Sequence, residues 1–311
     1  MMLDACRICC AHCDAVFGPD MLDYGVMTTR FNGARNGILV EKFMGMTRDE
    51  ETDEFLLRAK RRGKEENVRL AEACTALRKT MSLTEANAML GRGAMHVFSR
   101  KQVEKVLEVA GVSGSSSSRG WYMDVGAGCG EVTETLARVF GGKTCATESS
   151  AGMAARLRER GFEVVLESDS IENVVERVRS SEGGDDLLPH GFDVVSALNL
   201  VDRIETPMTL MRQLRECLQP GRGILILAIV VPFRPFVERA DGSRGKPLET
   251  VNAPSSGSWE AGVEALWENL IQPSGFELVA LTRVPYISEG DHKFDAYVLD
   301  DAVFVLRAPA V

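Results

Sequence analysis

The residues whose types and spacing have the clearest chemical meaning lie in DVGAGCGE, residues 124–131. This glycine-rich segment directly follows an apolar stretch typical of a strand and directly precedes a helical pattern. Glycines let the backbone turn tightly and approach a ligand, and the first turn of a helix has N–H groups without helical partners. We therefore expect Asp124, Gly126, Ala127 and Gly128 to form part of a cofactor site.

A carboxylate that suits the same site is Glu148, which ends the next predicted strand. An acid in this position can accept hydrogen bonds from both hydroxyls of an adenosine ribose. Nicotinamide dinucleotide sites usually have a third glycine at the position that Glu131 occupies here. The pattern therefore favours S-adenosylmethionine as the cofactor, with a solvated strand end as the alternative interpretation of Glu148.

Other polar residues give weaker signals. Asp169 follows the third predicted strand, where it could meet the adenine edge of the cofactor or equally cap the next helix. His96 and His292 are isolated, and we do not expect either to be a catalytic base. The sequence shows no Ser-His-Asp arrangement and no histidine, cysteine and carboxylate cluster for a catalytic metal.

Four cysteines crowd together near the N-terminus, at Cys6, Cys9, Cys10 and Cys13. Tetrahedral zinc sites usually join two cysteine pairs across a longer loop, and here the pairs abut. Four ligands from so short a segment would be cramped, so we expect a poorly structured tail rather than a metal site.

The elements that must position these residues begin at residue 121, where strand and helix patterns start to alternate as in an α/β domain. Strand patterns lie at Trp121–Val125, Thr144–Thr147, Phe162–Leu166, Phe192–Leu198, Ile224–Val231, Phe276–Arg283 and Ala296–Leu306. Helical patterns lie at Glu131–Phe140, Ala151–Arg160, Ile171–Arg179, Pro207–Leu218 and Ser258–Ile271. The last two strands are joined by a loop. This order predicts a seven-stranded, Rossmann-like class I methyltransferase sheet whose last strand inserts antiparallel.

The chain is expected to divide into four parts. Residues 1–45 show no sustained period and predict a loosely ordered, cysteine-rich tail, and residues 46–110 predict an N-terminal helical cap. A Gly/Ser loop at residues 111–120 separates this cap from the methyltransferase domain at residues 121–311.

Composition excludes some classes of partner. The formal charge of −9 argues against a nucleic acid, whose affinity for proteins comes largely from Lys and Arg. The longest apolar run, Ile224 to Val231, is far too short to span a membrane, and the N-terminus lacks the apolar stretch of a secretory signal. We therefore expect a cytoplasmic protein with reduced thiols. The sequence leaves its oligomeric state open.

Several blocks of the sequence closely resemble the DREV-type methyltransferases, a family of protein-histidine N-pros-methyltransferases. The matching blocks run from about residue 83 to residue 307 and read LGRGAMHVFS, DVGAGCGEVT, ATESSAGM, DVVSALNLVDR, PFRPFVE, TRVPYISEGD and YVLDDAVFVL. The resemblance implies methylation of the Nδ1 (pros) nitrogen of histidine in His-x-His motifs of protein or peptide substrates.

The same resemblance assigns roles to residues in the matching blocks. Asn199 and Asp202 would follow the fourth strand and face cofactor and substrate, and Tyr286 and Tyr297 would line the substrate pocket. Two positions depart from the family's pattern: Cys129 replaces an aspartate common in the glycine loop, and Arg234 occupies the variable position of PFRP.

The expected chemistry needs no strong base, because neutral imidazole already has a lone pair in its ring plane. For Nδ1 to attack a methyl group, the ring proton must lie on Nε2. A carboxylate hydrogen-bonded to Nε2–H would enforce this tautomer and stabilise the charge that develops on the ring. Asp202 is the candidate for this role, and a helix cap or a partner for Arg203 is the alternative.

Two other functions stay open at this point. The chain could methylate small molecules on the same fold, or it could be a non-catalytic module that binds S-adenosylmethionine. Convergent polar residues at Asp124, Glu148 and Asp202 argue against the second.

Overall fold

The computed structural model describes residues 22–112, 120–167, 171, 174–180, 191–239 and 243–310. Asp169, the four N-terminal cysteines and most of the predicted Gly/Ser loop lie outside these residues.

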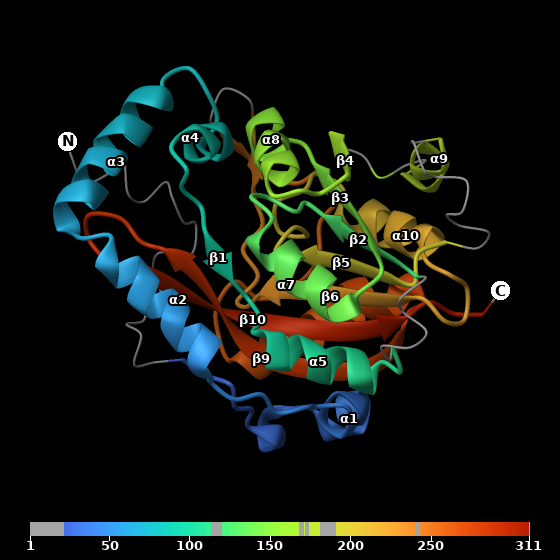
Figure 1. Ribbon diagram of the computed structural model, residues 1–311. Coiled ribbons are helices and arrows are strands. Elements are labelled where there is room, and N and C mark those ends of the chain that lie inside the picture. Colours follow the sequence, from blue (N-terminus) through green and yellow to red (C-terminus); the bar gives the residue numbers. More distant parts are fainter. Residues whose placement is uncertain are drawn as a thin grey trace.

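Eight strands form one mixed sheet in the order β1-β9-β10-β6-β5-β2-β3-β4 (Figure 1). In this order the strands are Met95–His96, Glu277–Glu289, Ala296–Arg307, Ile224–Val230, Val194–Leu198, Trp121–Val125, Lys143–Glu148 and Val164–Glu167. β10 is antiparallel to both β6 and β9, whereas β6, β5, β2, β3 and β4 pair in parallel. The α/β class and the antiparallel last strand are confirmed. The predicted count of seven strands is wrong, because β1 adds an eighth strand at the edge.

β9 is longer than the sequence pattern indicated, because it continues past Arg283 to Glu289. Pro285, two residues past the predicted end, cannot donate a hydrogen bond to a neighbouring strand. Proline is tolerated at this point because β1 pairs with β9 only at Ile287 and Ser288. The extension carries Tyr286 into the sheet.

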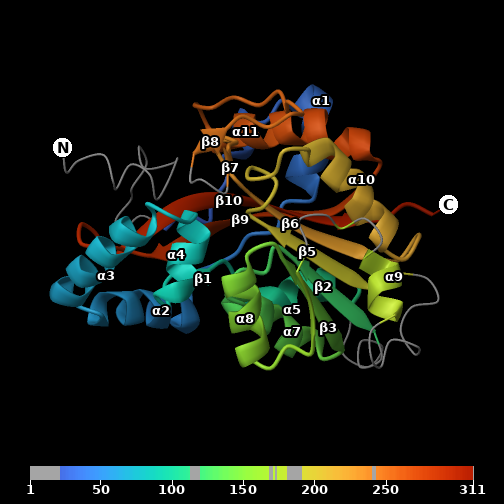
Figure 2. The same ribbon diagram turned by 90° about the horizontal axis from the view of Figure 1, so that it is seen from above.

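Helices cover both faces of the sheet (Figure 2). One face carries α5 (Arg100–Val109), α7 (Glu131–Phe140) and α8 (Ala151–Glu159). The other carries α1 (Gly33–Glu41), α10 (Pro207–Cys217) and α11 (Trp259–Leu266), and α11 continues into a π-helical turn at Trp267–Ile271. β6 lies between them with every residue buried, as its unbroken apolar run predicted. The short α9 (Val174–Arg179) and the hairpin of β7 (Val237–Glu238) and β8 (Arg244–Gly245) complete the domain.

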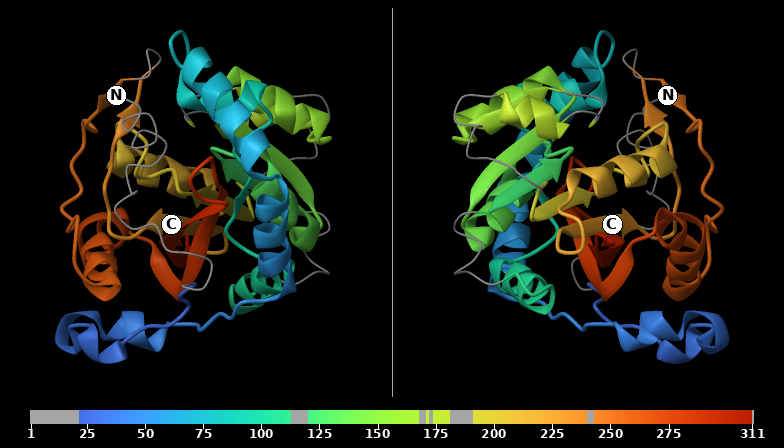
Figure 3. Two further views of the ribbon diagram at one scale, coloured as in Figure 1. Left: turned by 90° about the vertical axis from the view of Figure 1, so that its left-hand side faces the viewer. Right: turned by 90° about the vertical axis from the view of Figure 1, so that its right-hand side faces the viewer.

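The described part of the predicted N-terminal tail contains regular structure. α1 lies beneath α11 (Figure 3), and Glu264 of α11 accepts hydrogen bonds from the Asn32 N–H and from the Asn36 side chain. Phe31 and Leu39 pack into the main core. The helix has little periodicity of its own, so its stability comes from these tertiary contacts.

Residues 46–110 hold α2 (Glu50–Arg61), α3 (Lys64–Leu77), α4 (Leu83–Met89), β1 and α5. β1 joins the sheet and α5 packs on its face, so these two elements belong to the α/β layers. Among the described residues, none of the helices has both the length and the apolar character needed to cross a bilayer.

Candidate active site

The glycine loop connects β2 to α7 in a tight turn. Gly126, Gly128 and Gly130 have φ angles of 73°, 56° and 84°, which side chains rarely allow. The N–H groups of Gly126 and Ala127 both donate to the carbonyl of Thr147 in β3 at 3.0 Å. The loop therefore turns these donors toward the protein rather than toward a ligand.

Glu148 ties the end of β3 to this loop. Its Oε2 accepts a hydrogen bond from the Gly128 N–H at 2.8 Å, and its Oε1 accepts one from the Ser150 N–H at 2.9 Å. The side chain is buried. Each carboxylate oxygen has a second acceptor site, so Glu148 can still accept hydrogen bonds from ligand hydroxyls.

The loop and Glu148 together suit a cofactor that has a ribose and no phosphate. A pyrophosphate would need inward-facing N–H donors, but those of Gly126, Ala127 and Gly128 are used within the protein. S-adenosylmethionine avoids this obstacle, because its adenosine is linked to methionine through sulfur.

Asp124 lies beneath the loop rather than on its surface. Its buried carboxylate accepts hydrogen bonds from Thr133 of α7 and Ser196 of β5, each at 2.5 Å, and Ser196 also contacts the Tyr122 hydroxyl at 2.7 Å. Burial raises the pKa of Asp124 to about 6. Asp124 therefore joins α7 and β5 to β2 under the cofactor loop.

The segment after β5 lies against the glycine loop. A Cβ at Gly126 would come within 3.1 Å of Leu200, so this leucine covers the loop. Asn199, just before it, has a left-handed φ of 57°. Asp202 is buried, and the guanidinium of Arg203 donates to its carboxylate. The segment that holds Asn199 and Asp202 thus contacts the loop through Leu200, and Asp202 also has the arginine partner considered from the sequence.

A residue that the sequence analysis missed, Asp301 of β10, completes this cluster. It is fully buried, and its Oδ2 accepts a hydrogen bond from the Asn199 Nδ2 at 2.9 Å. Burial, with the negative charges of Asp202 and Asp300, raises the pKa of Asp301 well above its usual range. An acid within the apolar run YVLDDAVFVL was the available signal, since a strand with two buried faces must bury it.

The two predicted pocket tyrosines share one face of the β9–β10 hairpin with Asp301. Tyr286 lies opposite Leu299 and Tyr297 opposite Ser288, and alternate residues of a strand point to the same side. The Tyr286 hydroxyl donates to Met95 Sδ, and a Cβ at Gly128 would lie 3.7 Å from the methyl group of Met95. Met95 of β1 therefore links Tyr286 to the glycine loop.

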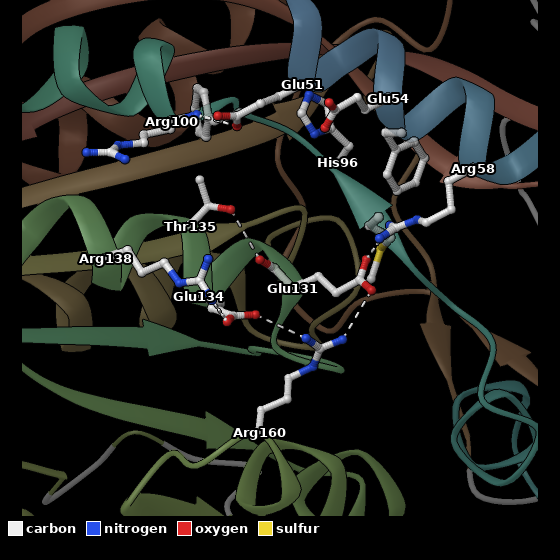
Figure 4. Close-up of a pocket in the computed structure, with 13 residues that line it drawn as sticks. Glu51, Glu54, Arg58, His96, Arg100, Glu131, Glu134, Thr135, Arg138 and Arg160 are labelled. Atoms are coloured by element: carbon white, nitrogen blue, oxygen red, sulfur yellow. Dashed lines mark hydrogen bonds and ion pairs between the residues drawn. The ribbon is translucent and has the colours of Figure 1, made fainter.

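A cavity of about 550 Å³ is lined by residues of α2, α5 and α7 and by Met95 and His96 of β1 (Figure 4). None of the site residues predicted from the sequence lines it. Its charges neutralise one another, because Glu131 pairs with Arg58 at 2.9 Å and with Arg160 at 3.1 Å, and Arg160 also pairs with Glu134. The group formed by Asn199, Asp202 and Asp301, at the carboxyl ends of the parallel strands, is therefore the better candidate for the active site.

The chain matches a family model and is similar to several curated proteins. The DREV methyltransferase family model matches residues 36–308, which include every site residue described above. A hybrid PKS-NRPS synthetase, lepA of Aspergillus flavus, is 26% identical over 203 residues. That match covers 60% of this chain but 5% of the synthetase, so the chain spans a small part of that protein's length.

Solved structures with low sequence identity are also similar. The [4+2]-cyclase SpnF has a TM-score of 0.42 and 19% identity, covering 68% of this chain and 82% of the cyclase. A Burkholderia thailandensis 1,6-didemethyltoxoflavin-N1-methyltransferase, solved with S-adenosylhomocysteine, has a TM-score of 0.39 and 16% identity over 68% of this chain and 78% of its own. An S-adenosylmethionine-dependent methyltransferase from Aquifex aeolicus has a TM-score of 0.36 and 17% identity. The match covers 66% of this chain and 88% of the Aquifex protein.

Proposed function

The chain belongs to the DREV methyltransferase family and takes S-adenosylmethionine as its cofactor, and we propose that its methyl acceptor is the pros nitrogen of histidine in His-x-His motifs of other proteins. The cofactor supplies an electrophilic methyl group. The protein must then orient a neutral imidazole and stabilise the charge that develops on it.

The buried Asp202 carboxylate carries this proposal. It lies in the segment that follows the carboxyl end of β5, three residues beyond Asn199, and Leu200 of this segment packs against the glycine loop. A hydrogen bond from imidazole Nε2–H to this carboxylate would leave the Nδ1 lone pair free to attack and would stabilise the imidazolium that forms. Arg203 donates to the same carboxylate and holds it in place.

The tyrosines support an aromatic acceptor. Tyr286 and Tyr297 project from the same face of the hairpin as Asp301, and Tyr297 packs edge-on against Phe294 with ring centroids 5.6 Å apart. Aromatic rings so placed can flank an imidazole and exclude water from the reaction.

The test is mass spectrometry of a peptide with two histidines separated by alanine, after incubation with the protein and S-adenosylmethionine. We expect one methyl group on a histidine, and we expect Asp202→Asn to lower kcat/KM by roughly a hundredfold or more, as for other lost charge-stabilising groups. Asp193→Asn is the matched control, because Asp193 accepts the Trp121 N–H at 2.7 Å at the opposite end of β5.

Retained cofactor binding without transfer to this peptide would contradict the histidine assignment. Transfer to free metabolites instead would establish a small-molecule methyltransferase. Equal loss in Asp202→Asn and Asp193→Asn would remove Asp202 from the mechanism.

A further inference from the structure

The side-chain amide of Asn199 has one end bound and one end open. Nδ2 donates to Asp301 Oδ2 at 2.9 Å. Oδ1 is buried, and among the described residues it has no hydrogen-bond partner. A buried acceptor left without a donor costs free energy, so this oxygen is expected to find a donor when the site is filled.

The orientation of this amide follows from the chemistry of its partner. A carboxylate has acceptors and no donors, so only the nitrogen end of the amide can face Asp301. A protonated carboxyl keeps one oxygen that accepts the same bond. With its nitrogen end bound to Asp301, the amide of Asn199 has its oxygen end pointing away from that carboxyl group.

Both ends of this hydrogen bond are held firmly. Asp301 lies in the middle of β10, paired with Val230 of β6 and Val284 of β9. The Asn199 N–H donates to the Ala228 carbonyl at 2.9 Å, which extends the β5–β6 ladder by one residue. Its left-handed backbone, one of the conformations that asparagine tolerates best, turns the chain out of the sheet at this point.

We propose that Asp301 is a positioning residue, which holds the Asn199 amide so that its oxygen accepts a hydrogen bond from an N–H group of the bound cofactor or substrate. This inference rests on the proposed function. The donor is either the α-ammonium group of the cofactor or a backbone N–H of the acceptor peptide. The bond to Asp301 also polarises the amide and makes its oxygen a stronger acceptor.

The structure offers a variant that separates positioning from folding. Asp301 sits in an apolar strand, so Asp301→Leu removes the acceptor while keeping a side chain that branches at Cγ, and its thermal unfolding is measured beside that of the wild type. Asp301→Asn keeps an oxygen that can accept from Asn199 Nδ2. Asp300→Asn is the control on the opposite face of β10, where Asp300 binds Arg283 at 2.8 Å.

Calorimetry should compare S-adenosylhomocysteine with 5′-methylthioadenosine, which lacks the amino-acid portion. If the donor is the α-ammonium group, Asp301→Leu should bind S-adenosylhomocysteine at least tenfold more weakly and methylthioadenosine as tightly as the wild type. If the donor is on the acceptor, both ligands should bind normally and kcat/KM for the histidine peptide should fall at least tenfold. Asp301→Asn should retain most of the wild-type ligand affinity and kcat/KM. Asp300→Asn should retain the wild-type values of both.

The proposal would be overturned if Asp301→Leu had wild-type dissociation constants for both ligands and a wild-type kcat/KM for the peptide. An equal loss for both ligands would also overturn it, because it would show a general disturbance of the site. If the wild type itself methylates no histidine peptide, the proposed function fails, and the ratio of the two ligand affinities alone then decides the role of Asp301.

Discussion

At the scale of single residues, backbone N–H groups hold a carboxylate of the candidate site in place. Glu148 is the clearest case, because each of its carboxylate oxygens accepts a hydrogen bond from a backbone N–H, one of them that of Gly128 in the loop. The neighbouring strand offers a natural comparison, since Glu167 of β4 pairs directly with Glu148 in the sheet register but is exposed and bound to Arg158 at 2.8 Å.

Glu148→Ala should weaken S-adenosylhomocysteine binding by roughly tenfold or more, because each hydrogen bond to a charged group contributes about 1.5–3 kcal/mol. Glu167→Ala should leave the dissociation constant within about twofold, as is usual for an exposed ion pair. Isothermal titration calorimetry of both variants gives the comparison. Similar affinities in the two variants would argue against Glu148 as a cofactor ligand.

His96 illustrates a histidine with a structural role. Its Nε2 lies 3.1 Å from the Thr52 hydroxyl and its ring packs near Phe55. Burial lowers the pKa of His96 to about 4 from the usual 6.5, despite the opposing charge of Asp49. The folded state therefore binds fewer protons than the unfolded state between these two pH values.

By this linkage, the free energy of unfolding should fall as the pH drops from 6.5 to 4, by up to about 3 kcal/mol from His96 alone. Urea unfolding across this range should show the slope in the wild type and its reduction in His96→Gln. The exposed His292 provides the control, since His292→Gln should follow the wild-type profile. Parallel curves for the wild type and His96→Gln would show that His96 keeps its ordinary pKa in the fold.

At the scale of elements, the strand–loop–helix unit of β2 and α7 combines binding with close packing. A Cβ at Gly128 would meet only the flexible end of Met95 at 3.7 Å. A Cβ at Gly130 would come within 2.7 Å of Leu157, which is fully buried in α8. Gly128 thus leaves room for a ligand to approach the backbone, and Gly130 lets α8 pack against the start of α7.

Gly130→Ala should therefore cost more stability than Gly128→Ala. Both add the strain of a left-handed backbone, on the order of 1 kcal/mol, and Gly130→Ala adds an overpacking cost of about 1–3 kcal/mol. Thermal unfolding of the two variants should show the lower Tm for Gly130→Ala. The reverse order would mean that the close approach to Leu157 relaxes without cost.

These elements also show what a single sequence can predict. Local patterns were sufficient for β2 and α7, whose bounds are as expected, because an apolar run, three glycines and an amphipathic helix follow one another directly. β1 has two residues and exists only because β9 lies beside it, so no local pattern could indicate it. The same holds for the bond between Asn199 and Asp301, which joins residues far apart in the sequence through the sheet order.

At the scale of the whole molecule, the candidate active site gathers residues from distant parts of the chain. Met95 comes from the edge strand, residues 124–148 supply the loop and Glu148, residues 199–202 supply the amide and the acid, and the β9–β10 hairpin supplies the tyrosines and Asp301. The N-terminal residues reinforce this assembly, because the Phe43 backbone bridges to Leu281 of β9. The match to the DREV methyltransferase family from residue 36 to 308 covers the same assembly.

The most direct measurement of the central claim identifies the atom that receives the methyl group. The protein should be incubated with S-adenosylmethionine carrying a carbon-13 methyl group and with the two-histidine peptide, and the product examined by NMR. The account predicts a methyl group on Nδ1, seen as a nuclear Overhauser effect between the methyl and the histidine β protons. A methyl group on Nε2, or on no histidine, would contradict it.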